Sequence, residues 1–431
     1  MELPILLTAV TIVLLLILSV PIAAALGLGV MVGMIAGDLP PEFMMQKVFS
    51  SLDSFPLLAV PFFILAGEIM QKGSMADALL RVSRCLVGHI TGGLAHVSIL
   101  TCMFYGALSG SSPATVAAVG GIMIPAMEKE GYPRDFSAAV NTSAGCLGVM
   151  IPPSVPLIIY GTTVGVSVSD LFIAGILPGI FVGVVLMFTA WALVRRRGIN
   201  VATRKARRRE TLRAVWEAKH ALLVPVIVLG GIYGGFFTPT EASVVAIFYS
   251  LIVGFFVYKE LTWKGVWEAL KKTLISSSSI MLIIGFTTIF TWVLTMQKVP
   301  QTVGAFFMSL NMPAWAIALI FDVLILMIGT FIDVSPAILL LTPILLPVMV
   351  QYGFSPLQFG AMMITGLAIG LVTPPVGMCL NACNKINRMP IIEIFKGAAP
   401  YVICNVIVLI SISLWGPLTT ALPQLLGYSI F

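Results

Sequence analysis

Residues 329–347 read GTFIDVSPAILLLTPILLP, and this stretch sets one carboxylate, Asp333, inside one of the most apolar runs of the chain. Between Val299 and Lys385 the only other charged residue is Asp322. The chain is 59% hydrophobic and 10% charged, whereas soluble domains carry about 25% charged residues. Uncharged runs of the roughly 20 residues that a helix needs to cross a bilayer recur along the chain, so we expect about ten to twelve crossing or re-entrant segments. The sequence therefore predicts an all-α polytopic membrane protein.

The positive charge of the chain is concentrated in one segment. Residues 195–213 hold nine of the 24 Lys and Arg residues. Basic segments between membrane helices stay on the cytoplasmic side, so we expect a basic cytoplasmic loop over 195–219 that connects two halves of the chain. A nucleic-acid site is the competing interpretation, but a basic loop between two spans is the usual signal of topology. We therefore expect no nucleic-acid partner.

A short amphipathic segment follows later in the chain. Residues 261–272 read LTWKGVWEALKK, with Trp263, Val266, Trp267 and Leu270 at helical spacing and lysines on the opposite face. This pattern is typical of a helix that lies on the membrane surface, and we expect it not to cross the bilayer.

The chain contains an internal repeat. The stretch that begins SGSSPATVAAVGGIMIP (109–125) matches the one that begins IDVSPAILLLTPILLP (332–347) in the order of its motifs. Four features lie 222 positions apart: Pro125 and Pro347, Gly131 and Gly353, Gly148 and Gly370, and Pro152–Pro153 and Pro374–Pro375. Ser112–Pro113 and Ser335–Pro336 differ by 223. We therefore expect two similar halves, 1–200 and 220–431, related as the inverted repeats of secondary transporters commonly are.

Each half carries two helix-breaking sites. One is a polar turn before a proline, Ser109–Pro113 or Asp333–Pro336, and the other is a double proline. Proline removes backbone donors and disfavours helix at the residue before it, and the freed carbonyls survive at membrane depth only inside protein or beside a watery cavity. Carbonyl and hydroxyl oxygens suit an alkali cation, while half-helix N-termini suit an anion. Ordinary helix kinks are the alternative, but repetition in both halves favours two cation sites with an organic anion between them.

Enzyme chemistry finds little support in the sequence. The six cysteines and three histidines complete no metal-binding set, and neither an HExxH motif nor a DDxxD carboxylate cluster of a lipid or isoprenoid transferase occurs. We therefore expect a transporter and not an enzyme.

The motifs together resemble one family. They read SLDSFPLLAVPFFILAGEIM (51–70), IPAMEKEGYPRDFSAA (124–139), GVMIPPSVPLIIYG (148–161), FTPTEASVVA (237–246) and GLVTPPVGM (370–378). This series is similar to the large membrane subunit of TRAP (tripartite ATP-independent periplasmic) transporters, and it runs over essentially the whole chain. One departure is MCLNACNKI (378–386), which is more polar than the stretch expected there.

The resemblance implies a fold and a mechanism. Such a protein resembles sodium-driven elevator transporters, which have a scaffold domain and a transport domain. It would have about 11 transmembrane helices and two re-entrant helical hairpins. The hairpins would lie near 95–130 and 313–351, with tips at Ser109–Pro113 and Asp333–Pro336. The broken helices would lie near 135–165 and 357–385.

The resemblance also implies partners and a cargo. We expect a separate small four-helix membrane subunit, because the chain begins directly with the first helix of the large subunit, and a periplasmic substrate-binding protein, at the inner membrane of a bacterium. Sialic acid and C4-dicarboxylates are substrates of such systems. We favour sialic acid because the candidate site is rich in hydroxyls and no arginine lies in the apolar core. The alternative is a stand-alone sodium-dependent anion carrier or antiporter of the same architecture.

The candidate site residues follow from the breaker sites and the resemblance. Two or more Na⁺ ions would be co-transported. For substrate contact we select Ser112, Ser154 and Asp333. For one sodium site we select Ser109, Ser111 and Gly148. For the other we select Val334, Thr373 and Gly377, acting mainly through hydroxyl and backbone oxygens.

Overall fold

The computed structural model describes residues 2–18, 20–38, 40–73, 75–199, 201 and 206–427, and all regular secondary structure in these ranges is helical. The first part of the chain forms α1 (Glu2–Ile17), α2 (Ile22–Ala36), α3 (Pro41–Leu52), η1 (Phe55–Leu58), α4 (Ala59–Lys72), α5 (Met75–Val87), α6 (Gly93–Ser109), α7 (Ser112–Lys129), α8 (Arg134–Ala144), α9 (Leu147–Met150), α10 (Val155–Val164) and α11 (Val168–Arg196). The second forms α12 (Arg208–Tyr233), α13 (Pro239–Ile252), η2 (Val253–Val257), α14 (Trp263–Met296), α15 (Val299–Ser309), α16 (Ala314–Gly329), α17 (Val334–Gln351), α18 (Pro356–Gly370), α19 (Met378–Asn387), α20 (Ile391–Leu414) and α21 (Pro417–Leu425).

Many of these helices are long and apolar. Within the described ranges, eight helical stretches are long and apolar enough to cross a membrane, and shorter apolar helices include α1, α2, α6, α16 and α18. The stretch Arg134–Val164, which contains α8, α9 and α10, is 94% buried in its most apolar window. This stretch therefore lies inside the protein and does not face lipid.

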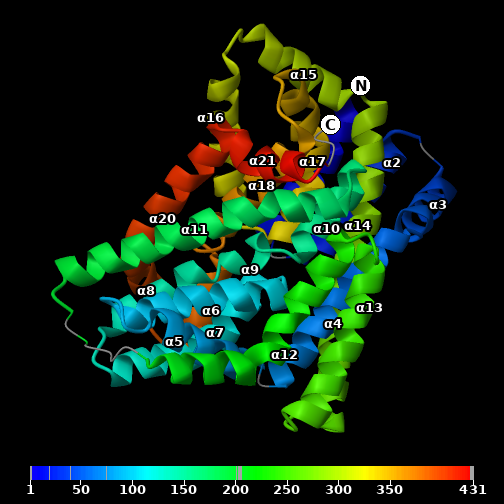
Figure 1. The fold of residues 1–431 in the computed structure, drawn as a ribbon. Helices are drawn as coiled ribbons and strands as arrows, with labels where there is room; N and C mark the ends of the chain where they lie inside the picture. Colours follow the sequence, from blue (N-terminus) through cyan, green and yellow to red (C-terminus); the bar gives the residue numbers. More distant parts are fainter. Residues whose placement is uncertain are drawn as a thin grey trace.

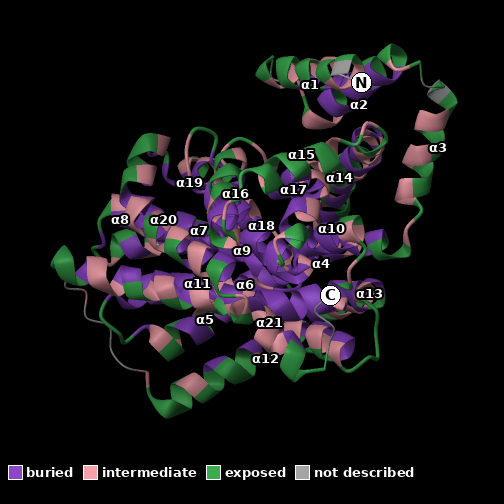
Figure 2. Cartoon of the chain, turned by 90° about the horizontal axis from the view of Figure 1, so that it is seen from above, coloured by how far each residue is buried: buried purple, intermediate pink, exposed green. Residues whose placement is uncertain are grey.

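The helices form a packed body with an outlying corner (Figure 1). Figure 2 shows α1, α2 and α3 at one edge of the body, where α1 packs on α2 and both α2 and α3 pack against α14, while the buried residues gather around α6, α9, α10 and α18. In the body, α4 packs against α13 and α14, and α12 packs against α5 and α13. The central group pairs α7 with α19, α10 with α17, and α18 with both α16 and α20.

Two tight turns join the helices of this central group. The hairpin expected over 95–130 corresponds to α6 and α7, and that expected over 313–351 corresponds to α16 and α17. At the first turn Gly110 has φ +59°, a left-handed conformation that glycine adopts without steric cost. At the second turn Asp333 is the N-cap of α17. The broken helices expected near 135–165 and 357–385 correspond to α8–α9–α10 and α18–α19.

The basic connection is shorter than expected, because α11 continues to Arg196 and α12 begins at Arg208. The expectation of a loop over 195–219 is therefore wrong for residues 208–219. The Glu210 carboxylate accepts a hydrogen bond of 2.8 Å from the Arg207 backbone N–H at the start of α12, and Ala214 and Ala218 pack against α5 in a small apolar cluster. Capping and packing thus make this end of the basic segment helical.

The amphipathic segment 261–272 is also part of a longer element. It runs without a break into α14, a helix of 34 residues that is about 51 Å long at 1.5 Å per residue. This exceeds the roughly 30 Å of a hydrocarbon core. The first turns, with the exposed Trp263 and Trp267, therefore begin a long helix and do not form a separate surface helix.

Candidate functional site

The turn of the first hairpin lies against the break between α9 and α10. A Cβ atom built on Gly110 would lie 3.2 Å from the Val155 nitrogen and 3.5 Å from the Pro153 carbonyl oxygen. The helix α4 reaches the same place, since a Cβ on Gly67 would lie 3.2 Å from the Leu108 carbonyl oxygen. Hairpin, broken helix and α4 therefore meet at one point.

Oxygen atoms gather at this meeting point. The Ser109 and Thr115 hydroxyls are 2.9 Å apart, and the Thr115 hydroxyl donates a 2.8 Å hydrogen bond to the Ser111 carbonyl. A Cβ on Gly148 would lie 2.4 Å from the Thr115 hydroxyl oxygen and 2.6 Å from the Ser111 carbonyl oxygen. Three of the expected sodium residues, Ser109, Ser111 and Gly148, are thus brought together, with Thr115 as a fourth member. Hydroxyl and carbonyl oxygens of this kind are hard ligands that suit Na⁺.

The corresponding residues of the second half are arranged less compactly. The Thr330 carbonyl accepts hydrogen bonds from the backbone N–H groups of Val376 (3.2 Å) and Gly377 (3.4 Å), which holds the second hairpin against the break between α18 and α19. Gly377 has φ +48°, and a Cβ there would lie 3.1 Å from the Thr373 carbonyl oxygen. The Thr373 hydroxyl donates to its own helix, at the Ile369 carbonyl (3.1 Å).

Val334 starts α17 on the other side of this turn. Within the described residues, no hydrogen bond joins Val334 to Thr373 or Gly377. Thr373 and Gly377 therefore share one turn, while Val334 reaches the cavity described next.

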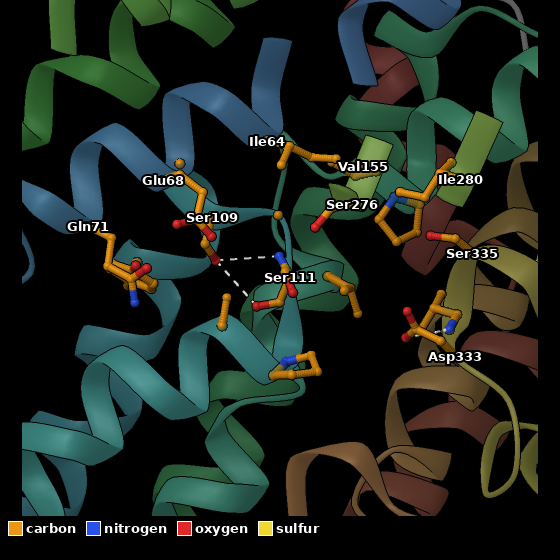
Figure 3. Close-up of a pocket in the computed structure, with 18 residues that line it drawn as sticks. Ile64, Glu68, Gln71, Ser109, Ser111, Val155, Ser276, Ile280, Asp333 and Ser335 are labelled. Carbon is orange, nitrogen blue, oxygen red and sulfur yellow. Dashed lines mark hydrogen bonds between the residues drawn. The ribbon is translucent and has the colours of Figure 1, made fainter. Parts of the chain in front are cut away.

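A cavity of about 200 Å³ lies between α4, α14 and the two hairpin turns. We call it the hairpin cavity. Its polar lining comprises Glu68, Gln71, Tyr105, Ser109, Ser111, Ser276, Asp333 and Ser335. Figure 3 shows Glu68, Gln71 and Ser109 on one side, Asp333 and Ser335 on the other, and Ser111 and Ser276 between them. The cavity thus joins both halves of the chain and holds two carboxylates, an amide and several hydroxyls.

Asp333 has two contacts with its surroundings. One carboxylate oxygen accepts a 2.8 Å hydrogen bond from the Val334 backbone N–H, which places the charge at the N-terminus of α17, where the helix dipole favours it. The half-buried side chain also lines the hairpin cavity. The carboxylate therefore faces a polar space and not lipid.

Ser112 and Ser154 are not among the residues that line the hairpin cavity. Ser112 is fully buried and its hydroxyl donates to the Cys146 carbonyl (3.3 Å), while the Ser154 hydroxyl donates to the Val149 carbonyl (2.5 Å). Both hydroxyls hold the broken helix of the first half in place. In this structure they are positioned to support the site and not to touch a molecule in the cavity.

Glu68, Gln71 and Ser276 line the cavity but were not among the expected site residues. The signal for Glu68 was present, because it is a carboxylate inside the apolar run FFILAGEIM (62–70). Its carboxylate oxygen Oε2 forms an ion pair with the Lys272 ammonium nitrogen Nζ, and the two atoms are 3.1 Å apart. Gln71 and Ser276 have no comparable signal, since only the packing of α4 against α14 brings them to the cavity.

The other carboxylates of the apolar runs have structural roles. Glu241 accepts hydrogen bonds from the backbone N–H and the hydroxyl of Thr238, 2.8 and 2.9 Å long, and so forms a capping box at the start of α13. Asp322 is 2% exposed and accepts a 2.9 Å hydrogen bond from the Ser413 hydroxyl, which ties α16 to α20.

Known proteins resemble this chain in fold. A transporter from Alcanivorax borkumensis, YdaH, superposes with a TM-score of 0.67 over 96% of this chain and 98% of its own, at 14% identity. The antimetabolite efflux pump MtrF of Neisseria gonorrhoeae superposes with a TM-score of 0.53 over 86% of this chain and 83% of its own, at 13% identity. At these identities the likeness concerns the fold alone.

Other known proteins are more similar to this chain in sequence than these two structures are. The isethionate TRAP transporter permease DctMQ of Oleidesulfovibrio alaskensis is 43% identical over 92% of this chain, which spans 62% of that longer protein. The C4-dicarboxylate large permease DctM of Pseudomonas aeruginosa is 38% identical over 89% of this chain and 90% of its own. The sialic acid large permease SiaM of Vibrio cholerae is 36% identical over 90% and 91%.

The family match agrees with these relatives. Residues 9–417 match the family described as the tripartite ATP-independent periplasmic transporter, DctM component. Because this match covers nearly the whole described chain, and because the large permeases above exceed 30% identity over most of its length, the chain belongs to the large membrane permeases of TRAP transporters.

Proposed function

We propose that the chain is the permease of a sodium-coupled importer of an organic acid in the inner membrane of a bacterium. The observation that supports this most is the hairpin cavity, which both hairpin turns line and beside which Ser109, Ser111 and Thr115 present a cluster of oxygens. Na⁺ would be held by this cluster and by oxygens of the Thr373–Gly377 turn, and the acid would occupy the cavity. Alternating access would follow from movement of the hairpins and broken helices against α4, α12, α13 and α14, as two inverted repeats permit.

The acid itself is left open in this proposal. Relatives carry isethionate, C4-dicarboxylates, sialic acid and 2,3-diketo-L-gulonate, and the expectation of sialic acid gains no support over the others. The common chemistry is a small carboxylate or sulfonate, several of them with hydroxyl groups. The hydroxyls of Ser109, Ser111, Ser276 and Ser335 in the cavity suit such a cargo.

Two partners are part of the proposal, because TRAP large permeases work with a small membrane subunit and a periplasmic binding protein. The test is uptake in proteoliposomes that contain this chain, a separately produced small subunit and the cognate binding protein. A panel of labelled isethionate, succinate, sialic acid and 2,3-diketo-L-gulonate identifies the cargo. We expect uptake of one class that requires a Na⁺ gradient and all three components.

Two results would change this conclusion. Full uptake with K⁺ in place of Na⁺ would contradict sodium coupling. Uptake by this chain without the small subunit and the binding protein would instead support a stand-alone carrier of the same fold.

A further inference from the structure

An anion in the hairpin cavity needs neutral hydrogen-bond donors. The described residues that line the cavity include two carboxylates, Glu68 and Asp333, and no lysine, arginine or histidine. An ionised carboxylate only accepts hydrogen bonds, so neither side chain can donate to the acid group of a cargo. The acid group must therefore be held by N–H and O–H groups of the lining.

Tyr105 supplies one such donor from the first hairpin. It lies on α6 one turn before Ser109, so the two residues share the face of this helix that borders the cavity. Tyr105 is 1% exposed, and its hydroxyl makes no hydrogen bond within the described residues. Its oxygen is nevertheless not among the partnerless polar atoms that are sealed from solvent. Because Tyr105 lines the hairpin cavity, its hydroxyl opens into that cavity.

Ser335 supplies a second donor, from the second hairpin. It is the second residue of α17, it is 8% exposed, and it lines the cavity two positions after Asp333. Its hydroxyl also makes no hydrogen bond in the described structure and is not one of the sealed atoms. Figure 3 shows its oxygen pointing toward the side of the cavity where Ser276 lies. A buried hydroxyl without a partner is unfavourable, so each hairpin places in the cavity one shielded hydroxyl that a bound molecule can satisfy.

The other free donors of the lining are less shielded. The side chains of Gln71, Ser111 and Ser276 also make no hydrogen bond among the described residues, but Gln71 and Ser111 are half-buried and Ser276 is exposed. Gln71 and Ser276 also belong to α4 and α14, against which the hairpins would move. An acid held by Tyr105 and Ser335 keeps both contacts during that movement, whereas its contacts with α4 and α14 would break.

We propose that Tyr105 and Ser335 donate hydrogen bonds to the carboxylate or sulfonate of the transported acid, one from each hairpin. This inference rests on the proposed function and deepens it, because it names side chains that travel with the cargo. Hydrogen bonds to an ionised acceptor are stronger than those between neutral groups, and carboxylates and sulfonates both present such oxygens. Asp333 and Glu68 are then left to accept from hydroxyl groups of the acid.

Single hydroxyl deletions test the two donors. Tyr105→Phe and Ser335→Ala each remove one oxygen atom. Tyr401→Phe and Ser143→Ala are the matched controls, because their hydroxyls are buried without a partner and both residues lie outside the cavity lining. Affinity is measured by calorimetric titration of the purified permease with its small subunit, at saturating Na⁺, with isethionate, succinate, sialic acid and 2,3-diketo-L-gulonate. We expect the Kd of the acid that the wild type binds to rise about ten-fold in each cavity variant and to stay within about two-fold in the controls.

The titrations also contain the results that would overturn the assignment. A wild-type Kd in Tyr105→Phe and Ser335→Ala would do so, and so would an equal rise in all four variants, which would show a general effect on packing. A higher Na⁺ concentration for half-saturation at saturating acid, with an unchanged Kd for the acid, would assign the two hydroxyls to the ion.

Ser276→Ala compares the hairpins with the helices they move against. We expect its Kd for the acid to stay within about two-fold of the wild type, because water replaces an exposed hydroxyl. A loss of affinity as large as that of Ser335→Ala would show that α14 holds the acid, against the proposal. If the wild type neither bound nor took up any acid of the panel, the proposed function itself would fail, and this result is recognised without any variant.

Discussion

At the scale of single residues, Asp333 marks a difference in charge between the two halves of the chain. The offset of 223 that relates Ser112 to Ser335 relates Asp333 to Gly110. Asp333 caps its helix with a carboxylate, whereas Gly110 takes a left-handed conformation and has no side chain. The two hairpin turns therefore differ in backbone conformation as well as in charge, and the two carboxylates that line the hairpin cavity are Asp333 of the second turn and Glu68 of α4.

A pair of substitutions separates the charge of Asp333 from its capping role. Asparagine caps helices about as well as aspartate, whereas alanine costs about 0.5–2 kcal/mol of stability. We expect Asp333→Asn to fold with wild-type thermal stability and to lose sodium-dependent uptake, because the charge that balances a cation or accepts from hydroxyls of the acid is gone. Asp333→Ala should lose uptake and also melt at a lower temperature. Unchanged uptake and sodium dependence in Asp333→Asn would reduce the residue to a structural cap.

Gly148 allows a second test at this scale. A Cβ there would lie 2.4 Å from the Thr115 hydroxyl oxygen and 2.6 Å from the Ser111 carbonyl oxygen, whereas a Cβ on Gly121 of α7 meets nothing within 4 Å. We therefore expect Gly148→Ala to push the oxygen cluster apart and raise the Na⁺ concentration that half-saturates uptake, while Gly121→Ala leaves it unchanged. Sodium titration of uptake is the measurement. An unaltered titration in Gly148→Ala would show that the cluster does not bind the ion.

At the scale of helices, the sequence predicted where the hairpins turn more accurately than it predicted which side chains face the cavity. Gly-Ser-Ser-Pro and Asp-Val-Ser-Pro have backbone requirements of their own, so the bounds of α6–α7 and α16–α17 lie close to the expected hairpins. A side chain's direction depends on rotation, and one residue turns a helix by about 100°. Ser111 thus faces the cavity while Ser112, one position on, faces the Cys146 carbonyl.

The sequence did not predict which helices far apart in the chain pack against each other. Gln71 and Ser276 reach the cavity from α4 and α14, which are separated by almost 200 positions in the chain and packed together only in the fold. The helical spacing of apolar residues in 261–272 also led to a wrong expectation, that of a separate surface helix. An amphipathic pattern does not indicate where its helix ends. The start of α14 carries no proline, and the helix continues through Gly265 to Met296.

Two ion pairs join α4 to α14, and they can be compared with each other. Lys72 pairs with Glu268 at 2.6 Å and Lys272 with Glu68 at 3.1 Å. Both pairs are partly exposed, so each contributes about 0–1 kcal/mol to stability. Only Glu68 lines the hairpin cavity, where its charge attracts cations.

We expect Glu68→Gln and Glu268→Gln to melt within a few degrees of the wild type, and only Glu68→Gln to weaken the sodium dependence of uptake. Thermal unfolding in detergent and sodium titration in proteoliposomes measure the two effects. A similar loss of uptake in both variants would mean that the ion pairs act by holding α4 on α14 and not through the cavity.

At the scale of the whole molecule, the cavity lies between two groups of helices. Its oxygen cluster and both turns belong to the hairpins and broken helices, while Glu68, Gln71 and Ser276 belong to α4 and α14. An ion held by the first group would travel with it if that group moved against the second. The net charge carried inward is then the sum of the charges of the ions and of the acid that the moving group holds.

This sum can be measured through the membrane potential. If two Na⁺ enter with one monoanion, one net positive charge moves inward, which is worth about 2.3 kcal/mol per 100 mV, or about a 50-fold increase in the accumulation ratio at equilibrium. We expect uptake into proteoliposomes at a fixed Na⁺ gradient to rise when a K⁺ diffusion potential makes the interior negative, and to fall when the potential is reversed. A dianion carried with two Na⁺ would leave accumulation insensitive to potential, so the charge of the acid that the panel identifies must be known before the response to potential is converted into a number of Na⁺ ions. Insensitivity with a monoanion would contradict the co-transport of two Na⁺ ions and leave the oxygen cluster as a single sodium site.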